Sequence, residues 1–233
     1  MIFATKTIEN FLSADEITEI EAMINAGMAG FMVDFPESAR EELTDKGIDR
    51  VANILNLPIY NDTHTRLNEI LLPKLQEHFH KDIFIDDCHI LESHSPYRVH
   101  TDATDDDAEN YTIKPADGMI PAWTFIIPLD TYNSNTIIFD QSSSKYKGPE
   151  IWVEKTNPPL LNSIDEETYN KYFINMASPI VLKYFSIEEI FPWKKGNLSA
   201  AAREKFHCSD NFLKNGVKQK RAIVMWTTIP KDS

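Results

Sequence analysis

Cysteine is scarce in this sequence of 233 residues, which contains only Cys88 and Cys208. Two cysteines cannot build a disulfide framework or a Cys-based zinc site, so we expect a reducing, cytoplasmic compartment. Long hydrophobic runs are also missing, because nothing approaches the ~18 consecutive apolar residues that a membrane-spanning helix needs. The first residues lack a basic segment followed by an apolar one, which is the pattern of a secretory signal. The sequence therefore predicts neither a secreted protein nor a membrane protein.

Basic residues are few relative to acidic ones. The sequence has 23 Lys and Arg against 36 Asp and Glu, a formal net charge of −13. Proteins bind a phosphate backbone through clustered Lys and Arg, so we do not expect a nucleic-acid partner. The negative charge favours a neutral or cationic small molecule, or a peptide side chain, as the substrate. Nothing in the sequence indicates a particular oligomeric state.

The first eighty residues predict helices in an ordinary folded chain. Hydrophobic residues make up 42% of the sequence, with 7 Gly and 13 Pro, which is typical of a globular protein and not of a disordered one. Ser13 and Glu16 have the spacing of a capping box at a helix start. Further helices are expected at 38–56 and 62–80, and Pro73 should kink or divide the latter. The apolar stripes of the first and last helices are Ile17, Ile20, Ile24 and Met28, and Leu67, Ile70, Leu71 and Leu75.

From residue 82 onward, short apolar runs predict β-strands. Trp123–Leu129 is such a run next to proline, and further strands are expected at 136–140, 151–154, 180–185 and 221–229. Helices followed by strands predict one α+β domain over residues 1–233, in which 1–80 is mainly helical support and 82–230 is a β sandwich or barrel. The polar stretch at about 141–196, with a short helix at 165–172, is an insertion over a site or an ordinary surface excursion.

A histidine and an aspartate stand two positions apart within Tyr97–Asp102. If the backbone there is extended, the side chains of His100 and Asp102 project to the same face and can bind one metal ion. The pair alone is a weak signal, because a solvated loop pair has the same spacing. The acidic run at 105–107 is better explained as a solvated loop than as a second ligand set.

A third ligand is expected from a distant part of the chain, and His207 is the best candidate. Two imidazoles and one carboxylate on one face of an ion form the facial triad of non-heme iron(II) oxygenases, which leaves positions for a chelating cosubstrate and dioxygen. A 2-oxo dicarboxylic acid also needs a cation for its distal carboxylate. Arg221 begins an apolar strand fourteen residues after His207, and a guanidinium binds a carboxylate in bidentate fashion.

These residues together resemble the Fe(II)/2-oxoglutarate-dependent dioxygenases, and in general style the prolyl-hydroxylase and phytanoyl-CoA-hydroxylase-like branches of that superfamily. The resemblance covers most of the chain. It rests on Thr7–Ser13 as the entry to the helices, Tyr97–Asp102 as the first metal motif, Trp123–Asp130 as the next core strand, Trp193–Gly196 leading to His207, and Arg221.

The resemblance implies a double-stranded β-helix, a cupin-like jelly roll, with N-terminal helices packed outside and iron at its mouth. The implied cofactors are Fe(II), 2-oxoglutarate as cosubstrate and O2. The implied reaction is hydroxylation of an unactivated C–H bond with release of succinate and CO2. The implied catalytic metal ligands are His100, Asp102 and His207. Halogenating relatives have a small residue in place of the aspartate, so hydroxylation is favoured over halogenation.

The cosubstrate contacts follow the common pattern less closely. Arg221 is the implied cosubstrate-binding cation, and Thr136 and Tyr97 are further candidates for the pocket wall. A turn and strand cap would explain Thr136 equally well. The segment 198–203 has weak β-propensity for the strand before the second histidine, and Ile223 stands where a small residue is common.

The other histidines and tryptophans fit structural roles better than chemical ones. Trp123 and Trp226 are expected in the core. The remaining histidines have no comparable pairing and are expected on the surface or on helices, although His94 precedes the metal motif and is placed to line the pocket: His64, His78, His80, His89 and His94.

Two other functions are compatible with the same residues. A jelly roll can hold a metal or a ligand without catalysis, because a fold does not determine a function. A zinc-dependent hydrolase could use the same three ligands, but this function leaves Arg221 without a role and provides no general base.

Overall fold

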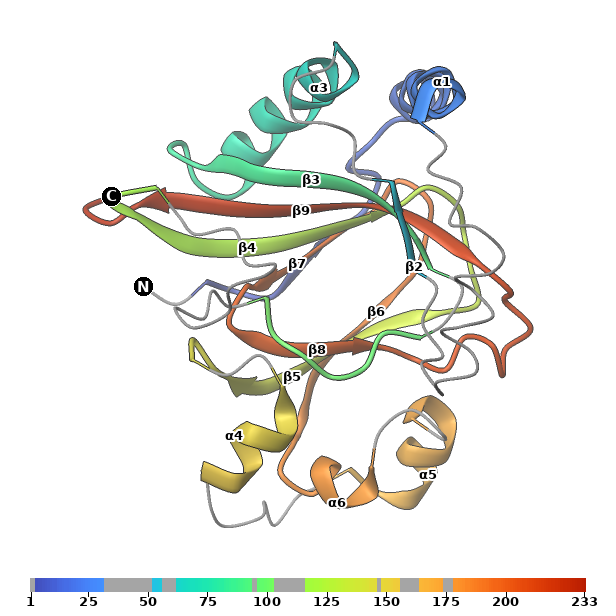
Figure 1. Ribbon diagram of the computed structural model, residues 1–233, viewed down its shortest axis with the longest axis vertical. Coiled ribbons are helices and arrows are strands. Elements are labelled where there is room, and N and C mark those ends of the chain that lie inside the picture. Colours follow the sequence, from blue (N-terminus) through green and yellow to red (C-terminus); the bar gives the residue numbers. More distant parts are fainter. Residues whose placement is uncertain are drawn as a thin grey trace.

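Figure 1 shows the computed structural model, which describes residues 3–31, 52–55, 62–93, 96–102, 116–145, 148–155, 164–173 and 178–233. Helices and strands are mixed along the chain, and strands dominate its second half. In chain order the elements are β1 (Lys6–Ile8), α1 (Ala14–Phe31), β2 (Ala52–Leu55), α3 (Asp62–His78), β3 (Phe84–Ser93), β4 (Met119–Pro128), β5 (Asn135–Ser142), α4 (Pro149–Lys155), α5 (Glu166–Thr168), the π-helix η1 (Tyr169–Phe173), α6 (Pro179–Leu182), β6 (Ile187–Pro192), β7 (Leu198–Ala202), β8 (Lys205–Ser209) and β9 (Lys220–Pro230).

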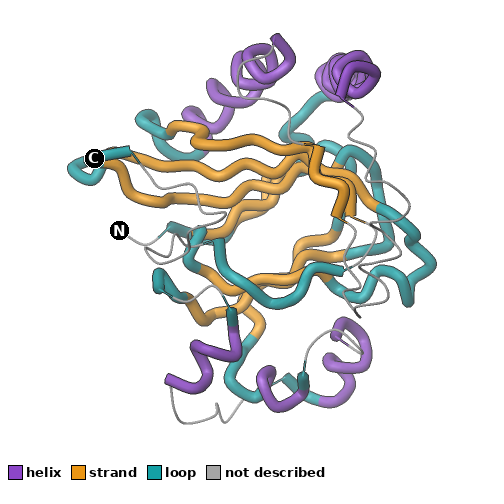
Figure 2. The backbone as a smooth tube through the Cα atoms, in the orientation of Figure 1, coloured by secondary structure: helices purple, strands orange, loops and turns teal. Residues whose placement is uncertain are grey.

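The strands form two antiparallel sheets that face one another (Figure 2). The larger sheet has the order β1-β7-β4-β9-β3-β2, and the smaller has the order β6-β5-β8. The chain passes back and forth between them, since β4, β7 and β9 belong to the larger sheet and β5, β6 and β8 to the smaller. Consecutive strands from β4 to β9, except β5 and β6, therefore lie in opposite sheets. The predicted mixture of helices and sheets is confirmed, and both sheets are antiparallel.

Helices α1 and α3 cover the outer face of the larger sheet (Figure 1). The predicted capping box is present at the start of α1: the backbone N–H of Ser13 donates to the Glu16 carboxylate at 2.8 Å, and that of Glu16 to the Ser13 hydroxyl at 3.3 Å. Pro73 lies inside the single helix α3 and does not divide it. Among the described helices, none is long and apolar enough to cross a membrane. Both helices bury the described side chains of the predicted stripes, and the side chain of Met28 lies outside the description. The buried members are Ile17, Ile20, Ile24, Leu67, Ile70, Leu71 and Leu75.

A second helical layer covers the outer face of the smaller sheet. The elements α4, α5, η1 and α6 lie there (Figure 1), and their core is aromatic: Phe139, Phe173, Phe185 and Phe206. The strands predicted at 151–154 and 180–185 were wrong, because α4 includes the first and α6 the start of the second. Proline in the first helical turn and the Ser178 N-cap outweigh the β-branched residues that suggested strands.

Two predicted boundaries also change. Residues 52–55, the end of the helix expected at 38–56, form β2, which pairs with β3; residues 38–51 and 56 lie outside the described part of the chain. Strand β6 lies within the insertion expected at 141–196 but belongs to the smaller sheet. The described helices of that insertion pack on the outside of the sheet, away from the space between the sheets.

Candidate metal and cosubstrate site

The first metal motif lies beside β8 although it is not part of a regular strand. The backbone N–H of His100 donates to the carbonyl of His207 at 3.0 Å, and the N–H of His207 donates back to His100 at 2.8 Å. The N–H of Ser209 donates to the carbonyl of Tyr97 at 3.1 Å. This antiparallel pairing sets the two imidazoles side by side, with ring centroids 4.3 Å apart.

Asp102 completes a cluster with the two histidines. One oxygen of its carboxylate lies 3.7 Å from Nε2 of His100, and the other lies 3.3 Å from Nε2 of His207. The three candidate ligand atoms all lie within 4.8 Å of one another. The structure thus brings together the three residues proposed from the sequence, from two segments a hundred positions apart.

The hydrogen bonds of the two imidazoles prepare them to bind a metal. Nδ1 of His100 lies 2.7 Å from the carbonyl oxygen of Arg98, and Nδ1 of His207 lies 3.1 Å from that of Lys205. A carbonyl can only accept, so each Nδ1 carries a proton, and Nε2 is the ring nitrogen turned toward Asp102. A backbone carbonyl on the second nitrogen is the usual partner of a metal-binding histidine.

The carboxylate of Asp102 is held in its charged form. Burial raises its pKa, but His207 and His100, with hydrogen bonds from the side chains of Thr124 and Trp226, outweigh burial and lower the pKa below its ordinary value. The hydroxyl of Thr124 donates to the carboxylate at 2.7 Å. Two imidazole nitrogens and one carboxylate oxygen are a donor set suited to non-heme Fe(II), and the residues present therefore fit such an ion.

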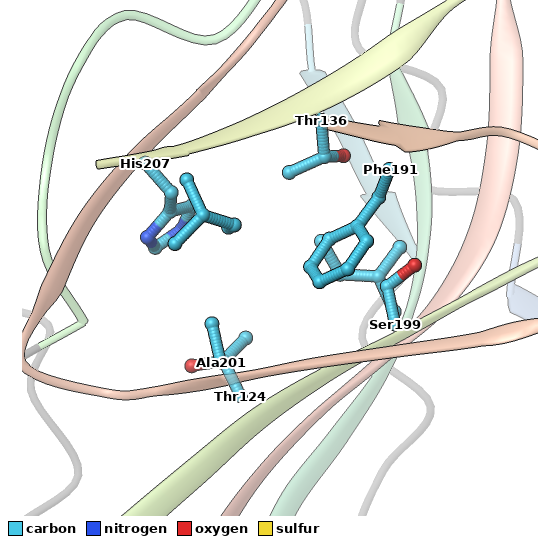
Figure 3. A pocket seen from close by; sticks show the side chains of 8 residues that line it. Thr124, Thr136, Phe191, Ser199, Ala201 and His207 are labelled. Carbon is cyan, nitrogen blue, oxygen red and sulfur yellow. The ribbon is translucent and has the colours of Figure 1, made fainter. Parts of the chain in front are cut away.

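A pocket extends from His207 between the two sheets (Figure 3). The smaller sheet contributes Thr136, and the strand opposite contributes Ser199. The hydroxyl of Thr136 is buried and accepts a hydrogen bond at 2.8 Å from the indole nitrogen of Trp193. Thr136 therefore lies in the pocket wall. The complete lining is Thr124, Ile126, Thr136, Ile138, Phe191, Ser199, Ala201 and His207.

A buried cation lies at the start of β9. Lys220 is only 1% exposed, and its Nζ lies 3.7 Å from the ring centroid of Trp193 and 4.7 Å from that of Phe212. Its ammonium donates to the Ser134 hydroxyl at 3.0 Å, and that hydroxyl donates to the Asp210 carboxylate at 2.8 Å. Burial lowers the pKa of Lys220 to about 7, although Asp210 opposes the change.

Arg221 is not among the residues that line the described pocket, and its side chain bonds to that of Tyr132. Side chains alternate between the faces of a strand, and Val224 and Trp226 pair in register with Ile126 and Thr124, which line the pocket. Lys220 shares their parity, whereas Arg221 shares the parity of Ile223 and Met225, whose side chains pack under the helices. The cation on the pocket side of β9 is thus the residue immediately before the one selected from the sequence.

The remaining candidates have varied positions. The ring of Tyr97 lies 5.5 Å from that of His100, which places it beside the metal cluster. The ring of His78 packs against Phe11, and Nδ1 of His80 accepts from the backbone of Asp82 at 3.2 Å, so both have structural roles. His94 lies outside the described residues.

Four residues that contact the cluster or the pocket wall had no site role in the sequence-based prediction. Thr124 and Trp226 bond to Asp102, Trp193 bonds to Thr136, and Lys220 packs on Trp193. Trp226 had been expected in the core, but it contributes a hydrogen bond that lowers the pKa of Asp102. The only signal for Lys220 is its even spacing from Ala222, Val224 and Trp226. That signal becomes useful only when one knows which face of the strand is turned toward the pocket.

Comparisons with known proteins define the fold class. No protein-family model matches the chain, and neither does any curated protein. The crystal structure of HygX from Streptomyces hygroscopicus with nickel and 2-oxoglutarate bound is similar, with a TM-score of 0.55 and 13% identity over 99% of this chain and 84% of that one. The non-heme alpha ketoglutarate dependent carbocyclase SnoK from nogalamycin biosynthesis has a TM-score of 0.53 and 10% identity, over 97% and 80% of the two chains.

The epimerase SnoN, in complex with Fe3+, alpha ketoglutarate and nogalamycin RO, has a TM-score of 0.50 and 12% identity, over 97% of this chain and 79% of that one. At these identities the comparison concerns the fold. The chain has the fold of these 2-oxoglutarate-dependent enzymes along nearly its whole length.

Proposed function

We propose that this protein is an Fe(II)- and 2-oxoglutarate-dependent oxygenase built on a double-stranded β-helix. The observation that carries the proposal is the cluster of His100, Asp102 and His207, in which both Nε2 atoms face the carboxylate. The passage of the chain between two antiparallel sheets from β4 to β9, and the pairing of His100 with His207, support the jelly-roll topology.

The three ligands would hold iron through Nε2 of His100, Nε2 of His207 and the carboxylate of Asp102. Bound iron, with 2-oxoglutarate and O2, supplies the oxidising power for attack on an unactivated C–H bond, with release of succinate and CO2. The protein's own part is to orient the ligands. The carbonyls of Arg98 and Lys205 fix the imidazoles, and Thr124 fixes the carboxylate.

We assign the distal carboxylate of 2-oxoglutarate to Lys220 and not to Arg221. Lys220 is on the pocket side of β9, and its buried ammonium has aromatic rings and one hydroxyl as its nearest partners. An anion beside it would stabilise the protonated amine, because an opposite charge offsets the cost of burial. Trp193 contacts both this ammonium and the hydroxyl of Thr136, so it links the cation to the pocket wall.

We propose hydroxylation of a small molecule or a peptide side chain as the reaction. Asp102 occupies one ligand position that a halogenase would leave for chloride, which supports oxygen transfer. The similar folds include a carbocyclase and an epimerase, so product analysis must distinguish hydroxylation from ring closure or inversion.

Both cysteines are buried and unpaired, which supports the predicted cytoplasmic location.

Anaerobic titration tests the proposal. The metal-free protein is titrated with Fe(II) and then with 2-oxoglutarate, and the weak visible charge-transfer band of a 2-oxo acid on Fe(II) is recorded. We expect the band with the unsubstituted protein and no band with His207→Ala. Iron binding without the band would instead favour a metal-binding module or a hydrolase.

A further inference from the structure

Arg203 is the most deeply buried arginine among the described residues, and it lies next to the candidate metal ligands. It follows β7 at the turn into β8 and is only 2% exposed. One guanidinium nitrogen forms an ion pair with the Asp86 carboxylate at 2.8 Å. Its Nε donates to the backbone carbonyl of Asp102 at 3.4 Å, and its own carbonyl accepts from the N–H of Asp102 at 2.9 Å. Both backbone groups of the ligand are therefore bonded to one residue.

Asp86 reaches Arg203 because of a β-bulge. The pairing of β3 with β9 shifts in register between Ile85 and Asp87, which leaves Asp86 as the extra residue. A bulge redirects the side chain of its extra residue, and bulges are common beside active sites. The carboxylate of Asp86 accepts from the Thr228 hydroxyl at 2.7 Å as well as from Arg203.

A second irregularity is joined to the same arginine. The register of β4 with β9 shifts between Pro121 and Thr124, and the backbone N–H of Arg203 donates to the carbonyl of Ala122 in that interval at 3.1 Å. The guanidinium also donates to the carbonyl of Thr227 at 3.5 Å. Arg203 thus connects two bulges of the larger sheet to the segment that carries Asp102.

We propose that Arg203, oriented by Asp86, is a positioning residue that fixes the Asp102 backbone and thereby the direction of its carboxylate toward both histidines. This inference rests on the proposed function. A buried ion pair alone is weak support for a gain in stability, because apolar replacements of both partners are often neutral or stabilising. The contacts of Arg203 with the backbone N–H and carbonyl of Asp102 instead support a role in positioning this candidate metal ligand.

Cobalt(II) titration monitored by visible absorption tests the inference without turnover or cosubstrate. The central variant is Arg203→Met combined with Asp86→Asn, which removes both charges and keeps an acceptor for Thr228. We expect it to melt near the temperature of the unsubstituted protein but to bind Co(II) about 10- to 100-fold more weakly, the usual cost of losing an outer-shell partner of a metal ligand. The d–d absorption bands should also change, since the carboxylate direction changes.

A second variant covers the case in which the double variant does not fold. Arg203→Lys keeps a charge for Asp86 but loses the planar fork that reaches Asp102, and we expect it to weaken Co(II) binding by about tenfold. The matched control is Lys74→Met, which removes the Lys74–Glu16 ion pair at 2.8 Å in the helical layer. This control should bind Co(II) like the unsubstituted protein.

The outcomes separate the inference from the proposed function. Unchanged Co(II) affinity and spectrum in the Arg203 variants would overturn the inference while the metal site stands. An equal loss of affinity in Lys74→Met would also overturn it, because the effect would then be general. If the unsubstituted protein binds no Co(II), or if binding survives in His207→Ala, the metal site proposed above is wrong, and the inference fails with it.

Discussion

The two faces of the larger sheet differ in chemistry although they alternate along the same strands. On β9, Ile223 and Met225 are fully buried under α1 and α3 in an apolar layer. Their neighbours on the opposite face include the cation Lys220 and the indole of Trp226. One face stabilises the fold and the other carries the candidate site, and a shift of one residue exchanges them.

The candidate site depends on the helical layer although the helices do not contact it. The outer face holds the strands in register through apolar burial, and register decides which side chains reach the pocket. Substitutions on the outer face should therefore change stability, whereas those on the inner face should change binding.

Removal of an inner-face metal ligand should abolish metal binding while the protein stays folded. The ring of His207 donates from Nδ1 to the carbonyl of Lys205 in its own strand, and its truncation leaves the backbone pairing of β8 with β5 intact, so His207→Ala should retain the cooperative melting transition. Anaerobic Fe(II) titration should detect no specific binding. Retained iron binding at the affinity of the unsubstituted protein would contradict the assignment.

An outer-face truncation should have the opposite effect. Met225 is fully buried, so Met225→Ala should lower the free energy of unfolding by about 2–5 kcal/mol, the usual cost of such a truncation. Urea denaturation measures this loss. The Fe(II) affinity of the folded fraction should stay unchanged, and a weakened metal site would show that the two faces are not independent.

The two adjacent cations of β9 offer a direct comparison. Lys220→Met should weaken 2-oxoglutarate binding by about 10- to 100-fold, since a hydrogen bond to a charged group contributes about 1.5–3 kcal/mol. Arg221→Met should change that affinity less than about twofold, because its side chain lies on the other face. Isothermal titration of the Fe(II)-loaded variants under anaerobic conditions would measure both, and a reversed order would restore Arg221 as the cosubstrate residue.

The affinity for 2-oxoglutarate should also depend on pH. The pKa of Lys220 is lowered to about 7 by burial, so the amine of the free protein is charged below that pH and neutral above it. Binding of an anion requires the charged form, and the affinity should therefore fall by up to about tenfold per pH unit above 7. Titrations at several pH values measure the slope, and Lys220→Met should remove it.

The same pKa predicts an effect on the stability of the free protein. Lys220 binds its proton less tightly in the folded state than in the unfolded state, whose ordinary value is 10.5. The unfolded state therefore holds more protons between these two values, and the contribution of Lys220 to the free energy of unfolding should rise with pH in that window. The unfolding curves of Lys220→Met should lack this contribution, and identical pH slopes in both proteins would argue against it.

Features with local signals in the sequence were predicted well. The Ser13–Glu16 capping box and the apolar stripe of α3 depend on spacings of three and four residues, and both are present. The cluster of His100, Asp102 and His207 was also predicted, because imidazole and carboxylate ligands limit the choice to a few residues. An extended backbone at 97–102 is then enough to put the side chains of His100 and Asp102 on the same face.

Features that depend on tertiary structure were not predicted. The pairing of β9 with β4 decides which residues of β9 share the face of the pocket-lining residues, and that pairing has no local signal. Helix α6 was read as a strand because Ile180 and Val181 favour strands, whereas Ser178 and Pro179 start a helix. The role of Arg203 has no signal in the sequence, because the bulge that directs Asp86 toward it depends on the pairing of β3 with β9.

A crystal structure of the anaerobic protein with Fe(II) and 2-oxoglutarate would test the central claim most directly. The account predicts one iron held by His100, Asp102 and His207, with the distal carboxylate of the cosubstrate against the ammonium of Lys220. Iron bound by other residues, or a distal carboxylate bound by Arg221 on the opposite face of β9, would contradict the account.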